Sequence, residues 1–285
     1  MPSLTSIIAS RLPSPVAGRL RSLKRSLMRN WIDESEIVAS QAPDGTYVLV
    51  DVGAHHADVT AVFLEKGWSV IAYEPDPANR RRFTERIGDN PRVQLSSAAV
   101  SETPGAMTLY TSPISAGISA LSSFDESHQA TTIVDVVTLA DDLRQRHVRR
   151  VDFLKIDIEG FDLFALKGFD WNYQPRYVLY EFEDRKTDPL GYSFHESSAF
   201  MAQHGYHLVY SVWEPIVQYG SRHRWRGLFL TAPTDMKSCW GNVLCFREEE
   251  DAELCMRRFG QGNRRRFRAL FDGRIASAGG SSSVE

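Results

Sequence analysis

Short apolar runs alternate with amphipathic stretches through the middle of the chain. The run at 47–52 is rich in β-branched residues, which predicts a buried strand. Similar patterns predict further strands at 68–74, 93–95, 107–110, 151–157 and 176–181. Helical periodicity follows the first of these runs and the one at 151–157. Another helix is expected over 77–87, because it begins with Pro-Ala and ends before a glycine.

Strands that alternate with helices predict an α/β fold with a mostly parallel, twisted sheet and helices on both faces. Ligands of such sheets bind at the carboxyl ends of the strands, near the point where the strand order reverses. Asp51, Glu74 and Asp157 each end a predicted strand. We therefore expect these three carboxylates to lie at one edge of the sheet, beside a ligand.

The turn after the first strand has the features of a nucleoside-cofactor loop. Gly53 lets the backbone turn tightly and approach a ligand closely, and the helix that follows offers free N–H groups. Glu74, at the end of the next strand, can accept hydrogen bonds from both ribose hydroxyls. An ordinary strand-helix-strand unit without a ligand is the alternative.

The glycine content of this loop bears on which cofactor it holds. Sites for nicotinamide dinucleotides favour three glycines, because the pyrophosphate presses against the turn. Here only Gly53 is present, and Ala57 takes the third place. S-adenosylmethionine (SAM) has no phosphate, and its ammonium favours a carboxylate, which Asp51 can offer directly or through water. The loop favours SAM, with an NAD(P)-dependent oxidoreductase as the alternative.

Four motifs connect the chain to a known family. They are Asp-Val-Gly-Ala at 51–54, Tyr-Glu-Pro-Asp-Pro at 73–77, Val-Val-Thr-Leu-Ala-Asp at 136–141 and Asp-Phe-Leu-Lys-Ile-Asp-Ile-Glu-Gly at 152–160. Over roughly residues 47–245 the chain resembles the FkbM family of SAM-dependent methyltransferases, and the segment 155–160 is the most specific part. The resemblance implies a Rossmann-like class I methyltransferase fold and O-methylation of hydroxyl groups on sugars or polyketides.

The resemblance also assigns roles to individual residues. Those expected to bind SAM are Asp51, Gly53, Ala54, His55, Glu74, Ser97 and Ala98. Those expected at the methyl-transfer step are Lys155, Asp157 and Glu159. The chain departs from the family where His55-His56-Ala57 replaces the usual Asn-Ile-Gly. His55 is expected either to touch the methionine carboxylate or to weaken cofactor binding.

The charged residues of the last motif alternate along the predicted strand end. Such spacing puts Lys155, Asp157 and Glu159 on one face, where three charges are costly unless they are paired or functional. An ion pair between Lys155 and a carboxylate is the structural alternative. The chain carries no metal-binding histidine motif, so we expect no dedicated metal site. A divalent ion held by Asp157 and Glu159 with waters stays open.

Aromatic residues are concentrated late in the chain, at 192–240, with basic residues interleaved at 222–226. Aromatic rings stack on sugars, so we expect the segment 192–226 to supply the acceptor pocket, with Trp213 and Trp225 in contact with the acceptor. A core and lid for the sheet is the alternative. The net charge of −3 argues against nucleic acid as the partner and leaves a carbohydrate or natural-product acceptor.

The two ends differ in composition from the middle. We expect a basic helical segment at 1–42, a SAM-dependent methyltransferase domain at 43–246, and a charged helix with a flexible tail at 247–285. The first segment either caps the main domain or makes peripheral contact with an anionic membrane. Three scattered cysteines and no apolar run of membrane-spanning length predict a cytoplasmic protein. A non-catalytic SAM-fold binding module is a further alternative.

Overall fold

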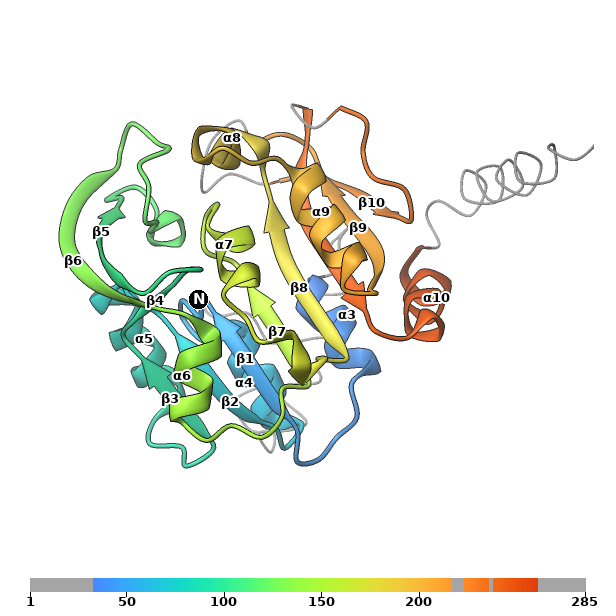
Figure 1. Ribbon diagram of the computed structural model, residues 1–285, viewed down its shortest axis with the longest axis horizontal. Helices are drawn as coiled ribbons and strands as arrows, with labels where there is room; N and C mark the ends of the chain where they lie inside the picture. The colour runs from blue at the N-terminus through green and yellow to red at the C-terminus, as the bar shows by residue number, and fades with distance from the viewer. Residues whose placement is uncertain (1–32, 217–222, 236–237, 261–285) are drawn as a thin grey trace, which may run out of the picture.

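The computed structural model describes residues 33–216, 223–235 and 238–260. Within these residues an eight-stranded sheet has the order β10-β9-β11-β8-β7-β1-β2-β3 (Figure 1). Its strands are β1 (Val48–Val52), β2 (Ser69–Tyr73), β3 (Val93–Ser96), β7 (Phe153–Ile156), β8 (Tyr177–Phe182), β9 (His207–Trp213), β10 (Trp225–Phe229) and β11 (Trp240–Phe246). The five strands from β3 to β8 pair in parallel, and β11, β9 and β10 continue the sheet antiparallel.

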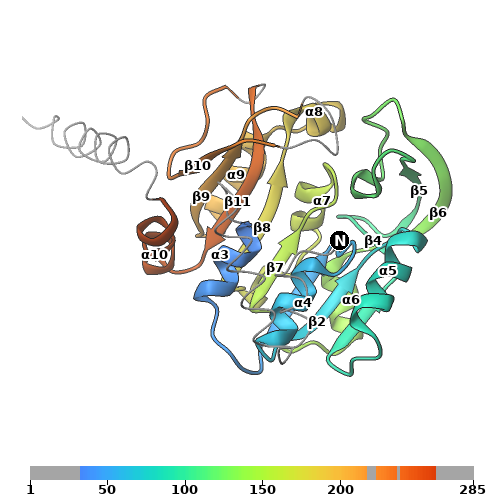
Figure 2. The same cartoon turned by 180° about the vertical axis from the view of Figure 1, so that it is seen from behind.

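Helices cover both faces of this sheet, as the front and back views show (Figures 1 and 2). One apolar core lies under α6 (Leu139–Gln145), α7 (Asp162–Lys167) and α9 (Phe194–Gln203). The other lies under α3 (Glu34–Gln41), α4 (Asp58–Glu65), α5 (Pro77–Ile87) and α10 (Glu249–Phe259). The predicted α/β class, a mostly parallel sheet with helices on both faces, is confirmed.

A smaller sheet stands beside the main one, in the order β4-β6-β5 (Figure 1). It consists of β4 (Ala99–Val100), β5 (Gly105–Thr111) and β6 (Gln129–Val137), with the short 3-10 helix η1 (Ala116–Ile118) between β5 and β6. Three short elements complete the fold: η2 (Trp171–Tyr173), α8 (Asp184–Thr187) and η3 (Asp188–Leu190). The small sheet extends from the end of β3, so it lies near the carboxyl edge of the parallel strands.

The local signals read from the sequence account for the parallel half. The helix predicted over 77–87 is found with these bounds, and the Asp76 carboxylate accepts a hydrogen bond from the Ala78 amide at its start. The strand predicted at 151–157 is shorter, because β7 ends at Ile156. The residues after it turn into a loop, in which Glu159 and Gly160 have left-handed backbone angles.

The aromatic segment builds the antiparallel half of the sheet. Trp213 is 4% exposed, stacks on Trp240 with ring centroids 5.5 Å apart, and donates its indole N–H to a Glu34 oxygen at 2.9 Å. Trp225 donates to the Ser211 hydroxyl at 2.9 Å. Trp213 is therefore part of the core and the half-buried Trp225 packs against it, as the alternative interpretation held.

This packing predicts that Trp213→Ala lowers the free energy of unfolding by about 3–5 kcal/mol, the usual loss for a large buried ring. Urea denaturation followed by circular dichroism measures it. A loss below about 1 kcal/mol, together with a raised KM for the acceptor, would instead place Trp213 in the acceptor pocket.

The predicted end segments are described only in part. α3, from the segment 1–42, packs on α4 and β8, and α10 packs on β9, β11 and α3. Cys255 of α10 is fully buried, so this charged helix has one apolar face in the core. The basic stretch before residue 33 and the arginine-rich tail after residue 260 lie outside the described residues. Among the described residues no helix is both long and apolar enough to cross a membrane.

Candidate active site

A cavity of about 330 Å³ lies at the carboxyl ends of β1, β2 and β7, where the strand order reverses. The loops after these strands line it, together with the start of α3 and the small sheet. Of the predicted site residues, those that line it are Gly53, Ala54, His55, Glu74, Ala98, Lys155, Asp157 and Glu159. Asp51 and Ser97 are absent from its lining among the described residues.

Glu74 binds the loop that follows β1. Its carboxylate accepts hydrogen bonds from the His55 amide at 2.8 Å and from the Asp76 amide at 2.9 Å. Glu74 is 4% exposed, and burial raises the pKa of its carboxyl, although the two backbone donors oppose the rise. Each carboxylate oxygen has a second lone pair, so this side chain can still accept hydrogen bonds from a ligand.

The cofactor loop is held against β2 and β7 in a way that only glycine permits. Gly53 has a φ of 75°, and a Cβ atom there would lie 1.9 Å from the carbonyl oxygen of Asp157. The amides of Gly53 and Ala54 both donate to the Tyr73 carbonyl at 3.0 Å. Ala57 is fully buried at the start of α4, which keeps the helix close to the sheet.

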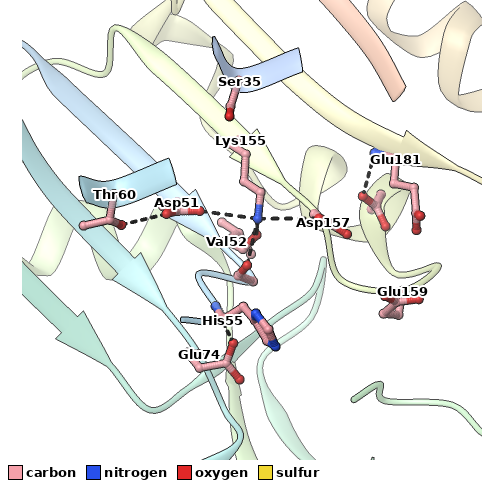
Figure 3. Close-up of polar contacts among 12 residues, drawn as sticks. Ser35, Asp51, Val52, His55, Thr60, Glu74, Lys155, Asp157, Glu159 and Glu181 are labelled. Atoms are coloured by element: carbon pink, nitrogen blue, oxygen red, sulfur yellow. Dashed lines mark hydrogen bonds and ion pairs between the residues drawn. The ribbon is translucent and has the colours of Figure 1, made fainter. Parts of the chain in front are cut away.

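Lys155 lies next to the loop after β1, and its ammonium makes hydrogen bonds and ion pairs with several acceptors (Figure 3). Its ammonium donates to the Gly53 carbonyl at 2.7 Å and lies 3.4 Å from Asp51 and 3.8 Å from Asp157. Burial alone would lower the pKa of this ammonium, but the charges of Asp51 and Asp157 outweigh it and raise the pKa. Lys155 therefore stays charged at the edge of the cavity.

Asp51 is fully buried and is not part of the cavity lining. Asp51 and Lys155 are register partners in β1 and β7, which places their side chains together. The Thr60 hydroxyl donates to one oxygen of Asp51 at 2.7 Å, and the Lys155 ammonium lies near the other. The ion pair offered above as the structural alternative is present.

Asp157 and Glu159 follow the end of β7 and do not belong to the strand, contrary to what their alternating spacing had suggested. Asp157 follows β7, and its side chain is 47% exposed toward the cavity. Glu159 is buried, has a φ of 57° and pairs with Lys186 at 2.6 Å. The expectation of one shared strand face is wrong for Glu159, because the chain has already left β7. Burial raises the pKa of the Glu159 carboxyl to about 7, against the attraction of Lys186.

Sequence reasoning missed the acidic cluster around Lys186. This lysine is 2% exposed and lies 2.8 Å from Glu181 and 3.0 Å from Glu183, besides Glu159. Oxygen atoms of Asp157, Glu159 and Glu181 lie within 4.8 Å of one another, a grouping that can hold a metal ion. Because the Lys186 ammonium pairs with two of these carboxylates, it supplies the positive charge that a metal would bring.

His55 has a positive φ angle, and one of its ring nitrogens makes no hydrogen bond. Its φ is 47°, its ring stacks on His56 with centroids 3.6 Å apart, and its Nε2 atom is buried without a hydrogen-bond partner. Burial, with His56 beside it, lowers the pKa of His55, so the ring is neutral near pH 7. A buried, unused ring nitrogen in the wall of a cavity suits a polar ligand.

The cavity is also lined by two segments that sequence reasoning missed. The small sheet and the loop after η1 contribute mainly small and apolar side chains: Leu109, Gly117, Ser119, Ala120 and Leu121. The Ser119 hydroxyl donates to Asp76 at 2.8 Å, which joins this segment to the loop after β2. The start of α3 contributes Asp33, Glu34 and Ser35. By contrast, none of the described residues in 192–226 lines this cavity, and residues 217–222 lie outside the described part of the chain.

Glu34, at the start of α3, is a buried acid in the wall of the cavity. It is 6% exposed and accepts hydrogen bonds from the Ser211 hydroxyl at 2.5 Å and from Trp213. Burial, and then the nearby Asp33, raise the pKa of the Glu34 carboxyl from 4.5 to about 7. A carboxyl with a raised folded-state pKa stabilises the fold below its unfolded pKa, and this contribution is lost as the pH rises through 7.

Glu34→Gln, which mimics the protonated acid, is therefore expected to be more stable than the unchanged protein at about pH 8, by up to about 3 kcal/mol, and equally stable near pH 4.5. Urea denaturation at several pH values measures this difference. Glu65→Gln at the exposed end of α4 is the control and should show no such trend. A pH-independent effect of Glu34→Gln contradicts the burial of an ionisable Glu34.

The comparisons with known proteins identify the family of the chain. The model of the methyltransferase FkbM domain matches residues 51–208, so the chain belongs to the FkbM methyltransferase family, whose cofactor is SAM. A search of curated proteins finds no match. Family membership favours SAM over a nicotinamide cofactor.

The solved structures that resemble this chain share little sequence with it. A precorrin-6y C5,15-methyltransferase from Geobacter metallireducens is 10% identical over 74% of this chain and 85% of its own, with a TM-score of 0.40. A TehB-like SAM-dependent methyltransferase from Corynebacterium glutamicum is 12% identical over 82% and 97%, with a TM-score of 0.39. TrmK of M. capricolum with S-adenosyl-homocysteine is 9% identical over 77% and 70%, with a TM-score of 0.40.

Proposed function

We propose that this SAM-dependent methyltransferase methylates a hydroxyl oxygen of a glycan or of a glycosylated or polyketide small molecule, and that it works in the cytoplasm. The observation that carries the proposal is Asp157, a half-exposed carboxylate that lines the cofactor cavity directly after β7. A hydroxyl group is a poor nucleophile while it keeps its proton, and a carboxylate at the cavity wall can hold and receive that proton.

The residues around the cavity fit SAM. Glu74 has free lone pairs for the ribose hydroxyls, and Gly53 leaves room where any side chain would collide with Asp157. Ala98 lines the cavity after β3, the side expected for the adenine, and the orphaned Nε2 atom of His55 can bind a polar group of the cofactor. Bound in this cavity, SAM supplies the methyl group as an electrophile.

The chain's own residues then align the acceptor and manage its proton. Asp157 accepts a hydrogen bond from the acceptor hydroxyl and fixes the direction of its oxygen. Glu159, with a pKa raised to about 7, is better suited to take up the proton near neutral pH. Its partner Lys186 compensates the charge of the cluster before and after the transfer.

The test uses SAM with a labelled methyl group and a panel of neutral methyl glycosides and glycosylated polyketides. Transfer of label, with NMR of the product showing the methyl group on oxygen, is the expected result. Label on nitrogen or carbon contradicts O-methylation. SAM binding without transfer to any hydroxylated compound favours the non-catalytic binding module.

A further inference from the structure

Acidic side chains outnumber basic ones in the described lining of the cavity. Among the described residues that line it, Lys155 is the only side chain with a permanent positive charge. The lining acids are Asp33, Glu34, Asp58, Glu74, Asp157 and Glu159. SAM carries both a carboxylate and an ammonium on its methionine group. A carboxylate in this cavity can avoid repulsion only beside Lys155.

The geometry of Lys155 leaves it able to bind one more acceptor. An ammonium has three N–H donors, and good N–H···O distances lie between about 2.7 and 3.2 Å. The ammonium donates to the Gly53 carbonyl at 2.7 Å and, in a longer hydrogen bond, to the Val52 carbonyl at 3.3 Å. Its third N–H has only the longer ion-pair contacts with Asp51 at 3.4 Å and Asp157 at 3.8 Å, so it can bind a closer acceptor.

The position of Lys155 also fits the methionine end of the cofactor. Glu74 marks the ribose end, and His55, in the loop after β1, lies between Glu74 and Lys155 (Figure 3). Beyond Lys155, the start of α3 brings Glu34 and Ser35 to the cavity wall. A cationic group near Gly53 would be repelled by Lys155, whereas the acids of α3 would attract it.

We infer that Lys155 binds the carboxylate of the SAM methionine group, while the ammonium turns toward the acids at the start of α3. The inference rests on the cofactor half of the proposed function and is independent of the acceptor. It makes Lys155 a cofactor-binding residue, in place of the role at the methyl-transfer step expected from the sequence. Asp51 then acts as a positioning residue, because it helps to hold the ammonium of Lys155 at the end of β7.

The test compares SAM with decarboxylated SAM, which keeps the ammonium and lacks the carboxylate. Isothermal titration calorimetry measures both ligands with the full chain and with Lys155→Met. We expect Lys155→Met to bind SAM roughly 10- to 100-fold more weakly, the scale of a charge-assisted hydrogen bond. Its affinity for decarboxylated SAM should equal or exceed that of the unchanged protein.

Lys155→Met leaves Asp51 buried without its cation, so Lys155→Met/Asp51→Asn is the second variant and should show the same selective loss. Lys66→Met, which removes a lysine of a surface pair with Asp44, is the matched control and should bind both ligands normally. Equal losses for both ligands in the double variant would overturn the inference alone. Failure of the unchanged protein to bind SAM would overturn the proposed function as well.

Discussion

Asp157→Asn is expected to lower kcat by about a hundredfold or more and to leave the Kd of SAM within a few-fold. The substitution nearly keeps the shape of the side chain and removes the charge that holds the acceptor hydroxyl. The side chain is half exposed and makes only a long contact of 3.8 Å with Lys155, so the fold should tolerate the change. The measurement is steady-state methyl transfer to the acceptor, with calorimetry of SAM alongside.

Asp89→Asn, at an exposed position after α5, is the control and should keep full activity. A folded Asp157→Asn protein with near-normal turnover would remove Asp157 from the mechanism. The acceptor hydroxyl would then have to be held by another residue of the cavity wall, such as Glu159 or the neutral ring of His55.

Glu74→Ala should weaken SAM binding by about 1.5–3 kcal/mol, the scale of hydrogen bonds to a charged group. The loss has two sources that act together: the ribose hydroxyls lose their acceptor, and the amides of His55 and Asp76 lose theirs. Calorimetry with SAM measures it. Glu85→Ala on the exposed side of α5 should leave the affinity unchanged, and an unchanged Kd in folded Glu74→Ala would contradict the ribose placement.

The parallel half of the fold could be predicted because each of its strands is a short apolar run with a turn signal after it. β1 and β2 are found within one residue of the predicted runs, and the carboxylates that end the runs meet near one cavity. The reason is topological: parallel neighbours bring their carboxyl ends to the same edge. No long-range information was needed for Glu74 or Asp157.

The small sheet could not be predicted, because few residues of its longest strand, β6, are buried. β6 has nine residues, and only Val134 and Val136 are buried. Its cavity-lining neighbours are small residues such as Gly117 and Ala120, which carry no chemical signature in the sequence. The partner strand β5 was recognised at 107–110, but its pairing with β6 depends on contacts across the intervening loop.

Buried ion pairs are the second limit of sequence reasoning. Lys186 and Glu159 lie far apart in the chain, and only the fold brings them within 2.6 Å. The same is true of Glu34 and Trp213, which meet across α3 and β9. Alternating charges after β7 suggested one strand face, whereas the left-handed turn at Glu159 sends its carboxylate to Lys186.

The central claim is that the cavity at the ends of β1, β2 and β7 binds SAM. Isothermal titration calorimetry of the full chain with SAM, S-adenosylhomocysteine and NAD tests it most directly. The site predicts saturable binding of SAM and of its demethylated product at one site, with no binding of NAD, because the loop has one glycine where a pyrophosphate favours three. Binding of NAD without SAM, or of neither ligand, would contradict the account.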